Sequence, residues 1–199
     1  LPPRAANMHR LYAYLCRTRG IDHDIVTRFV RAGTLYEDAE RHNAVFLATD
    51  ERGKPVGGMK KCTLSGSKFR QTITGSDTRY SFCHKGTSGR VYVFEAAVDM
   101  LSFISMHKQN WQQHSYIALD GLSPKALLCF LDKHDMSEVI LCLDNDEPGI
   151  AAAERIGRQL QDRGCENVSV LLPRGKDWNC DIVQMQEIDM MMSFNVKRS

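Results

Sequence analysis

The stretch from Val139 to Gly149 constrains the fold of this chain more than any other. Five apolar residues are followed by two aspartates, Asp144 and Asp146, and then by a glycine that opens an alanine-rich stretch. The apolar run is typical of a buried strand, and the residues after it are typical of a helix. Carboxylates at the carboxyl end of such a strand lie where open α/β sheets bind their ligands. We therefore expect an α/β sheet with an acidic site at its edge.

The two aspartates allow two interpretations. Their like charges repel, and a bound divalent cation would make the arrangement favourable, with oxygen ligands that suit magnesium. Alternatively, Asp146 only caps the helix that follows. An EF-hand loop is excluded because its fifth and twelfth positions would be Pro148 and Arg155. A phosphatase motif of the Asp-x-Asp-x-Thr type is excluded because Pro148 stands where threonine is needed.

Strand and helix patterns alternate through the second half of the chain. The strands are predicted over residues 90–94, 115–119, 138–143 and 167–172, and the helices over 96–108, 123–133 and 149–163. This alternation predicts a mainly parallel four-stranded sheet with flanking helices, an α/β fold of the Rossmann-like kind. Asp120, after the second of these strands, is interpreted as a turn or cap residue.

The first half has a different pattern and predicts a small α+β domain. Two amphipathic helices are expected over residues 7–19 and 22–32, followed by antiparallel strands over 44–48, 56–64, 69–73 and 80–83. Gly86, Ser88 and Gly89 interrupt the pattern before the first parallel strand. The expected domains are therefore residues 1–88 and 89–199.

Acidic residues follow three of the predicted parallel strands. Glu95 comes directly after the first, Asp144 and Asp146 after the third, and Asp177 after the fourth. Because the carboxyl ends of parallel strands meet at one edge of a sheet, these carboxylates are expected on one rim. Their mutual repulsion should raise at least one pKa, which favours a protonated general acid.

The spacing of these residues resembles the toprim domain, which is shared by DnaG-type bacterial primases, topoisomerases and some nucleases. The motifs that match are Glu95-x-x-x-Asp99, Asp144-x-Asp146-x-x-Gly149 and Gly175-Lys176-Asp177. The chain looks closest to primase-like toprim proteins of bacterial mobile elements. The first half resembles the uncharacterised domain that precedes toprim in those proteins, through Arg19–Asp22, Asn43–Phe46, Gly53–Pro55 and Gly75–Asp77.

This resemblance implies roles for individual residues. Glu95 would be the general acid/base, and Asp144, Asp146 and Asp177 would hold Mg²⁺ or Mn²⁺. The supporting residues would be Asp99, Gly149, Lys176 and Asn179. Such primases usually carry an aspartate where this chain has Asn179, and a neutral ligand weakens a second metal site. Their zinc-binding module is absent from these residues, which contain no Cys-x-x-Cys pair.

The charge is divided unevenly along the chain. Residues 1–90 carry 16 Lys and Arg against 8 Asp and Glu, a net charge of +8, while residues 91–199 have a net charge of −6. A basic surface beside an acidic site suits nucleic acid, although solvated faces would give the same composition. The nucleic-acid-binding residues expected on this basis are Lys54, Lys60, Lys61, Lys68, Arg70 and Arg79.

The leading hypothesis is a Mg²⁺-dependent, primase-like nucleotidyltransferase. It would act on single-stranded DNA with nucleoside triphosphates, in replication or transfer of a mobile element, beside a helicase or relaxase partner. The alternatives are a toprim nuclease and a non-catalytic DNA-binding domain with a vestigial metal site. Seven scattered cysteines and apolar runs too short for a bilayer favour a cytoplasmic protein without membrane contact. The start at Leu1-Pro-Pro suggests a fragment of a longer protein.

Overall fold

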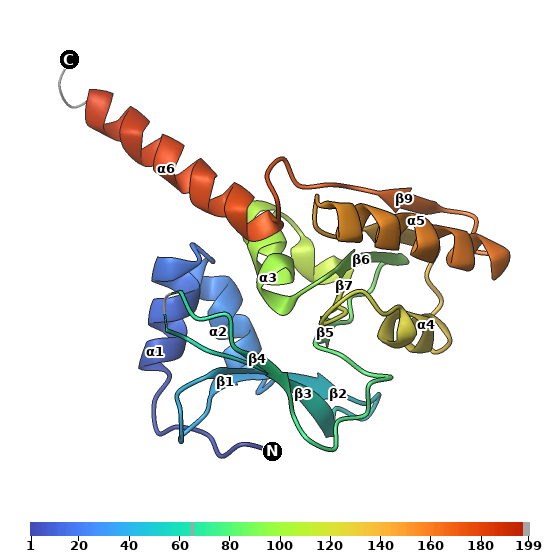
Figure 1. The fold of residues 1–199 in the computed structure, drawn as a ribbon, viewed down its shortest axis with the longest axis horizontal. Coiled ribbons are helices and arrows are strands. Elements are labelled where there is room, and N and C mark those ends of the chain that lie inside the picture. The colour runs from blue at the N-terminus through green and yellow to red at the C-terminus, as the bar shows by residue number, and fades with distance from the viewer. Residues whose placement is uncertain (65, 197–199) are drawn as a thin grey trace.

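The computed structural model describes residues 1–64 and 66–196, and its first half forms a small domain around an antiparallel sheet (Figure 1). The chain begins with the helix α1 and a π-helical segment η1, followed by the helix α2 and four strands. Their bounds are α1 His9–Tyr12, η1 Ala13–Thr18, α2 His23–Arg31, β1 Leu35–Glu37, β2 Ala44–Thr49, β3 Pro55–Lys61 and β4 Arg70–Thr72. The described strands pair in the order β1-β2-β3-β4, each antiparallel to its neighbour.

The second half forms a larger sheet with helices on its faces. Its strands are β5 Cys83–His84, β6 Arg90–Phe94, β7 Ser115–Ala118, β8 Glu138–Leu141 and β9 Val168–Val170. Its helices are α3 Ala97–Met106, the 3₁₀ segment η2 Trp111–Gln113, α4 Lys125–Leu131, α5 Glu147–Asp162 and α6 Trp178–Val196. Among the described residues the strand order is β5-β7-β6-β8-β9, with β7, β6, β8 and β9 parallel and β5 antiparallel at one edge.

This architecture confirms the α/β prediction with its four parallel strands, and it corrects three details. The predicted strand at residues 80–83 overlaps a strand only at Cys83, where β5 begins, and β5 pairs with β7 of the second sheet instead of the front sheet. Strand β1 was not predicted, because three residues are too few to show a period. The first predicted helix runs as α1 into η1, whose wider turns end at Arg19.

One hydrophobic core joins the two sheets. Phe46 from β2 packs on Phe82, with ring centroids 5.3 Å apart, and Phe82 packs on Phe29 from α2 at 5.1 Å. The same cluster of buried residues includes Phe94 at the end of β6 and Trp178 at the start of α6. Burial of this continuous apolar surface holds the front domain against the end of the parallel sheet.

Helix α6 extends away from the rest of the molecule, whereas α3 lies between the front domain and the parallel sheet (Figure 1). Met190–Met192, on the distal part of α6, are exposed. No helix in the described part of the chain combines the length and apolar character needed to cross a bilayer.

Candidate functional site

Asp144 lies at the carboxyl end of β8, beside the end of β6. Its carboxylate oxygen Oδ1 is buried, and it alone among the buried side-chain oxygens and nitrogens of the described residues has no hydrogen-bond partner. Burial and the nearby charge of Glu95 raise the pKa of Asp144 to about 7, with Asp177 and Asp146 adding to the shift and Lys176 opposing it. An unpaired buried carboxylate is costly in a folded protein, so this oxygen is suited to bind a cation.

Asp146 and Asp177 each use one carboxylate oxygen to cap a helix. Asp146 Oδ1 accepts from the backbone N–H of Gly149 at 3.0 Å, at the start of α5. Asp177 Oδ1 accepts from the backbone N–H of Cys180 at 2.7 Å, at the start of α6. The capping interpretation of Asp146 is thus confirmed, yet its Oδ2 remains at the rim, 3.6 Å from Lys176 Nζ.

Two further carboxyls complete the acidic side of the site. Asp99, on the first turn of α3, is 8% exposed. Burial and the charges of Asp144 and Asp177 raise its pKa to about 8. Glu95 follows β6 directly, and burial together with the charge of Asp146 raises its pKa as well. The carboxylates that follow three different strands therefore lie close enough to raise one another's pKa.

These residues fit a magnesium or manganese ion in their chemistry. The donors are all carboxylate oxygens, and Asp144 Oδ1 supplies an uncommitted one. Within residues 1–64 and 66–196, no three Asp, Glu, His or Cys side chains lie close enough together to form a complete cage. Mg²⁺ commonly binds only one or two carboxylates and completes its coordination with water and substrate phosphates. A site with one or two carboxylate ligands at an open rim is therefore suitable for Mg²⁺.

Basic side chains of the front sheet face this rim. Lys61 of β3 and Arg70 of β4 lie directly opposite each other in the register of the sheet. Like charges in that position destabilise a sheet, which favours an anionic partner for both. The two residues line a small cavity of about 30 Å³ together with residues 96–98 at the start of α3 and Asp120. The guanidinium of Arg70 also opposes the upward pKa shift of Glu95.

The other four predicted nucleic-acid-binding residues lie elsewhere. Lys54 is exposed in the turn between β2 and β3, and Lys68 is exposed in the loop before β4. Lys60 is adjacent to Lys61 on β3 and therefore points to the opposite face of the sheet. Arg79 pairs with Asp77 at 2.7 Å. The structure thus brings two of the six cations to the carboxylate rim.

Asn179 connects the front domain to the acidic site. It is 6% exposed, and its Oδ1 accepts from Arg19 Nη1 at 3.1 Å. Its Nδ2 donates to the backbone oxygen of Arg19 at 2.7 Å and to Ser102 Oγ at 3.0 Å, while its backbone N–H donates to Asp99 Oδ1 at 3.3 Å. Every polar atom of the side chain is therefore used within the protein. Asn179 acts here as a link between domains, with no free oxygen for a metal.

Replacing Asn179 with aspartate is expected to destabilise the protein by about 2 kcal/mol. The NH₂ group that donates to the Arg19 carbonyl and to the Ser102 hydroxyl becomes a carboxylate oxygen, which cannot donate to either. Urea unfolding measures this loss. Gln186→Ala, which removes a single hydrogen bond to the Gly20 carbonyl, is the control and should cost about 1 kcal/mol. An Asn179→Asp protein that is as stable as wild type and binds one more Mg²⁺ would contradict this role.

Sequence reasoning missed two residues at the site. Arg19 lies at the end of the π-helical segment, where its Nε donates to Tyr14 Oη at 3.1 Å and its guanidinium reaches Asn179. No pattern in the sequence connects positions 160 residues apart. Asp120 was interpreted as a turn residue, which its φ of 56° confirms, but it also lines a cavity between the two sheets.

Two regions of the chain match known protein families. Residues 92–182 match the protein family described as Toprim-like, and residues 13–88 match a family described as a protein of unknown function, DUF3991. An uncharacterized protein of Bacillus anthracis is 28% identical over 160 residues, which are 74% of this chain and 46% of that protein. The chain therefore spans about half the length of this relative.

Solved primase structures share the fold. The primase fragment of the bacteriophage T7 primase-helicase protein has a TM-score of 0.68 at 19% identity, covering 96% of this chain and 79% of the other. A DnaG primase catalytic domain bound to single-stranded DNA has a TM-score of 0.57 at 16% identity, covering 94% and 71%. The chain therefore contains a Toprim-like domain preceded by a DUF3991 domain, and its fold is similar to that of the DnaG and bacteriophage T7 primase cores.

Proposed function

We propose that the protein catalyses magnesium-dependent transfer of nucleotides from nucleoside triphosphates on a single-stranded DNA template. The observation that carries this proposal is the buried, unpaired Oδ1 of Asp144 at a rim shared with Glu95 and Asp177. Such a rim is suited to a divalent cation and the phosphates that it binds. The primase-like fold supports transfer on DNA, because the solved relative with single-stranded DNA belongs to the same structural group.

Glu95 is suited to move the proton in this reaction. When the attacking hydroxyl oxygen bonds to the α-phosphorus, the bond to the bridging oxygen breaks, pyrophosphate leaves, and Glu95 takes the hydroxyl proton. Burial and the charge of Asp146 raise the pKa of Glu95, which makes its carboxylate a stronger base than an ordinary glutamate. A cation held by Asp144 and Asp146, with water and substrate phosphates as its other ligands, would polarise the phosphoryl oxygens.

The basic face opposite the rim would hold the template strand. Lys61 and Arg70 face the carboxylates across the junction of the two domains. Phosphate contacts from such residues supply affinity without sequence preference. The plasmid designation pXO2 in the name of the Bacillus anthracis relative supports a role in replication or transfer of a mobile element, where a helicase or relaxase would act beside it.

The decisive experiment incubates the purified protein with single-stranded DNA, labelled nucleoside triphosphates and Mg²⁺. Product is expected for wild type, with a loss of at least about 100-fold in Glu95→Gln, because the general base is removed. DNA binding should weaken in Lys61→Ala and Arg70→Ala, each lowering the slope of log affinity against log salt by about 1. Lys54→Ala, which removes an exposed lysine far from the rim, is the matched control.

The other outcomes of this experiment identify the alternatives. Metal-dependent cleavage of the DNA without added nucleotides would indicate a nuclease that uses the same carboxylates. Salt-sensitive binding without product or cleavage, unchanged in Asp144→Asn, would indicate a DNA-binding domain. The use of Asn179 as a link between domains is the observation that favours this last alternative.

A further inference from the structure

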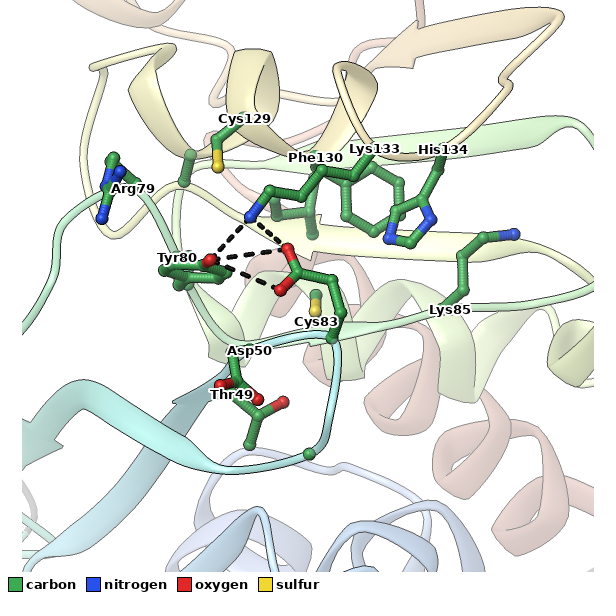
Figure 2. Close-up of a pocket in the computed structure, with 15 residues that line it drawn as sticks. Thr49, Asp50, Arg79, Tyr80, Cys83, Lys85, Cys129, Phe130, Lys133 and His134 are labelled. Carbon is green, nitrogen blue, oxygen red and sulfur yellow. Dashed lines mark hydrogen bonds and ion pairs between the residues drawn. The ribbon is translucent and has the colours of Figure 1, made fainter.

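The cavity between the front domain and α4 is crossed by a side chain whose charge is already neutralised. This cavity has a volume of about 310 Å³, and Figure 2 shows Lys133 extending across it. The Lys133 ammonium donates to Tyr80 Oη at 2.6 Å, lies 4.1 Å from the centre of the Tyr80 ring and forms an ion pair with Glu51. Because these groups satisfy one another, Lys133 is not available to bind a ligand there.

Strand β9 forms an open edge of the parallel sheet and lies at the margin of the molecule (Figure 1). Among the described strands it pairs with β8 alone. On either side of β9, the carbonyl oxygen of Asn167 and the N–H of Leu171 each form a hydrogen bond of 2.9 Å to β8. Backbone groups of successive residues in a strand point to opposite sides. Those of Val168, Val170 and Leu172 therefore point away from β8, toward the outer side of the sheet.

This edge lacks the features that usually prevent pairing with another chain. Exposed edge strands are commonly protected by charged side chains or by proline. No charged residue stands between Glu166 and Arg174, and the proline in this stretch, Pro173, is buried. Residues 170–172 are 52%, 42% and 38% exposed, and all three are apolar. An edge with outward backbone groups and exposed apolar side chains is suited to bind a further strand.

The charges at the two ends of this stretch are complementary to those of a second copy. Glu166 lies four residues before Val170, and Arg174 lies four residues after it. In an antiparallel pair with a two-fold axis at Val170, Glu166 of each copy is opposite Arg174 of the other, and Val168 is opposite Leu172. These alternate residues share one face of the sheet, so the opposed side chains contact each other.

Both charged residues are available for such pairing. Glu166 and Arg174 are exposed, and within the described part of the chain neither forms an ion pair. The equal spacing of opposite charges about Val170 favours a second copy over a strand of another protein, because only self-pairing requires that symmetry.

We propose that β9 pairs with β9 of a second copy of this chain, antiparallel and centred on Val170, so that the two parallel sheets form one continuous sheet. Val170 then exchanges its backbone hydrogen bonds with Val170 of the other copy, and Val168 exchanges them with Leu172. The apolar side chains of these residues are buried against each other, between the Glu166–Arg174 ion pairs. This inference does not depend on the proposed function.

The dimer should be in reversible equilibrium with the monomer. The paired segment is short, and interfaces below the standard size of about 1,600 Å² are usually weak or transient. We expect a dissociation constant on the order of 10 μM, which should rise with salt because the exposed ion pairs are screened.

The test is sedimentation equilibrium of the full chain from about 1 to about 200 μM, a range that spans the expected dissociation constant. Wild type is expected to change from monomer to dimer across this range. Val170→Lys places two ammonium groups opposite each other at the centre of the pair and should weaken the dimer at least about 10-fold.

Charge reversal tests the register of the pair. Glu166→Arg and Arg174→Glu should each weaken the dimer about 10-fold, because each replaces the two ion pairs with two repulsive contacts. The double variant exchanges the charges and should restore the wild-type affinity. Glu40→Arg makes the same change of charge at an exposed position of the front domain, so its affinity should equal that of wild type.

A wild type that stays monomeric at the highest concentration would overturn the inference, and so would a dimer whose affinity is unchanged in Val170→Lys. If the double charge variant dimerises no better than the single variants, Glu166 is not paired with Arg174 and the proposed register is wrong. Urea unfolding at low protein concentration, where every protein is monomeric, should give matching curves for wild type and these surface variants.

Discussion

In Asp144→Asn, nucleotide transfer is expected to fall at least about 1,000-fold, while the metal-free protein becomes about 2 kcal/mol more stable at pH 8. The two effects have one cause. Asp144 is buried beside Glu95, Asp177 and Asp146, so its negative charge opposes folding unless a cation is bound. Asparagine keeps the shape and removes the charge. Removal of the Asp144 charge also makes ionisation of the nearby Asp99 less costly.

The buried carboxyls of Asp144 and Asp99 should make the free energy of unfolding depend on pH. The folded pKa of Asp144 is about 7 and that of Asp99 about 8, both above the value of about 3.9 in an unfolded chain. Between these values the folded state binds more protons than the unfolded state, so stability decreases as pH rises from about 4 to about 8. Urea unfolding without divalent cations should show this decrease.

Two comparisons make the experiment specific. The stabilisation by Asp144→Asn should vanish at about pH 3, where the carboxyl is mostly protonated in both states. Added Mg²⁺ should stabilise wild type more at pH 8 than at pH 5 and should have little effect on the variant. Asp135→Asn should change none of these slopes, because this exposed aspartate lies outside the site. If the stability of the wild type without metal increases from pH 5 to pH 8, the buried charge of Asp144 does not destabilise the folded protein.

Replacing Gly149 with alanine should have the largest effect on folding of any single methyl group added to this site. A Cβ at that position would lie 2.2 Å from the carbonyl oxygen of Asp144 and 3.0 Å from its carbonyl carbon. Neither backbone atom can move without displacing the loop that carries the two aspartates. We expect a loss of about 3 kcal/mol in the free energy of unfolding, together with weaker Mg²⁺ binding.

Gly157 provides the matched control within the same helix. Its added Cβ would meet only Leu141 Cδ1, at an ordinary 3.9 Å, so alanine should stabilise α5 by about 0.5–1 kcal/mol. Opposite signs for Gly149→Ala and Gly157→Ala in one denaturation series would establish the close approach at the start of α5. Equal effects would show that helix propensity alone determines the role of Gly149.

The acidic rim could be predicted from the sequence because it depends on local patterns. A buried strand followed by Asp144 and Asp146, with Glu95 and Asp177 after neighbouring strands, places carboxylates at one edge of any parallel sheet. The same reasoning gave the alternation of helices and strands. Both follow from periods of a few residues, which short stretches of chain contain in full.

The tertiary structure alone decided how these parts meet. Pairing of β5 with β7, the link between Arg19 and Asn179, and the exposure of Asp120 to a cavity all join residues distant in the chain. Such contacts depend on how apolar surfaces of both domains pack into one core, and no local pattern encodes that packing. The sequence by itself therefore determined which carboxylates share an edge. Packing decided that Oδ1 of Asp144 is buried without a hydrogen-bond partner, and that the side chain of Asn179 is fully used in holding the domains together.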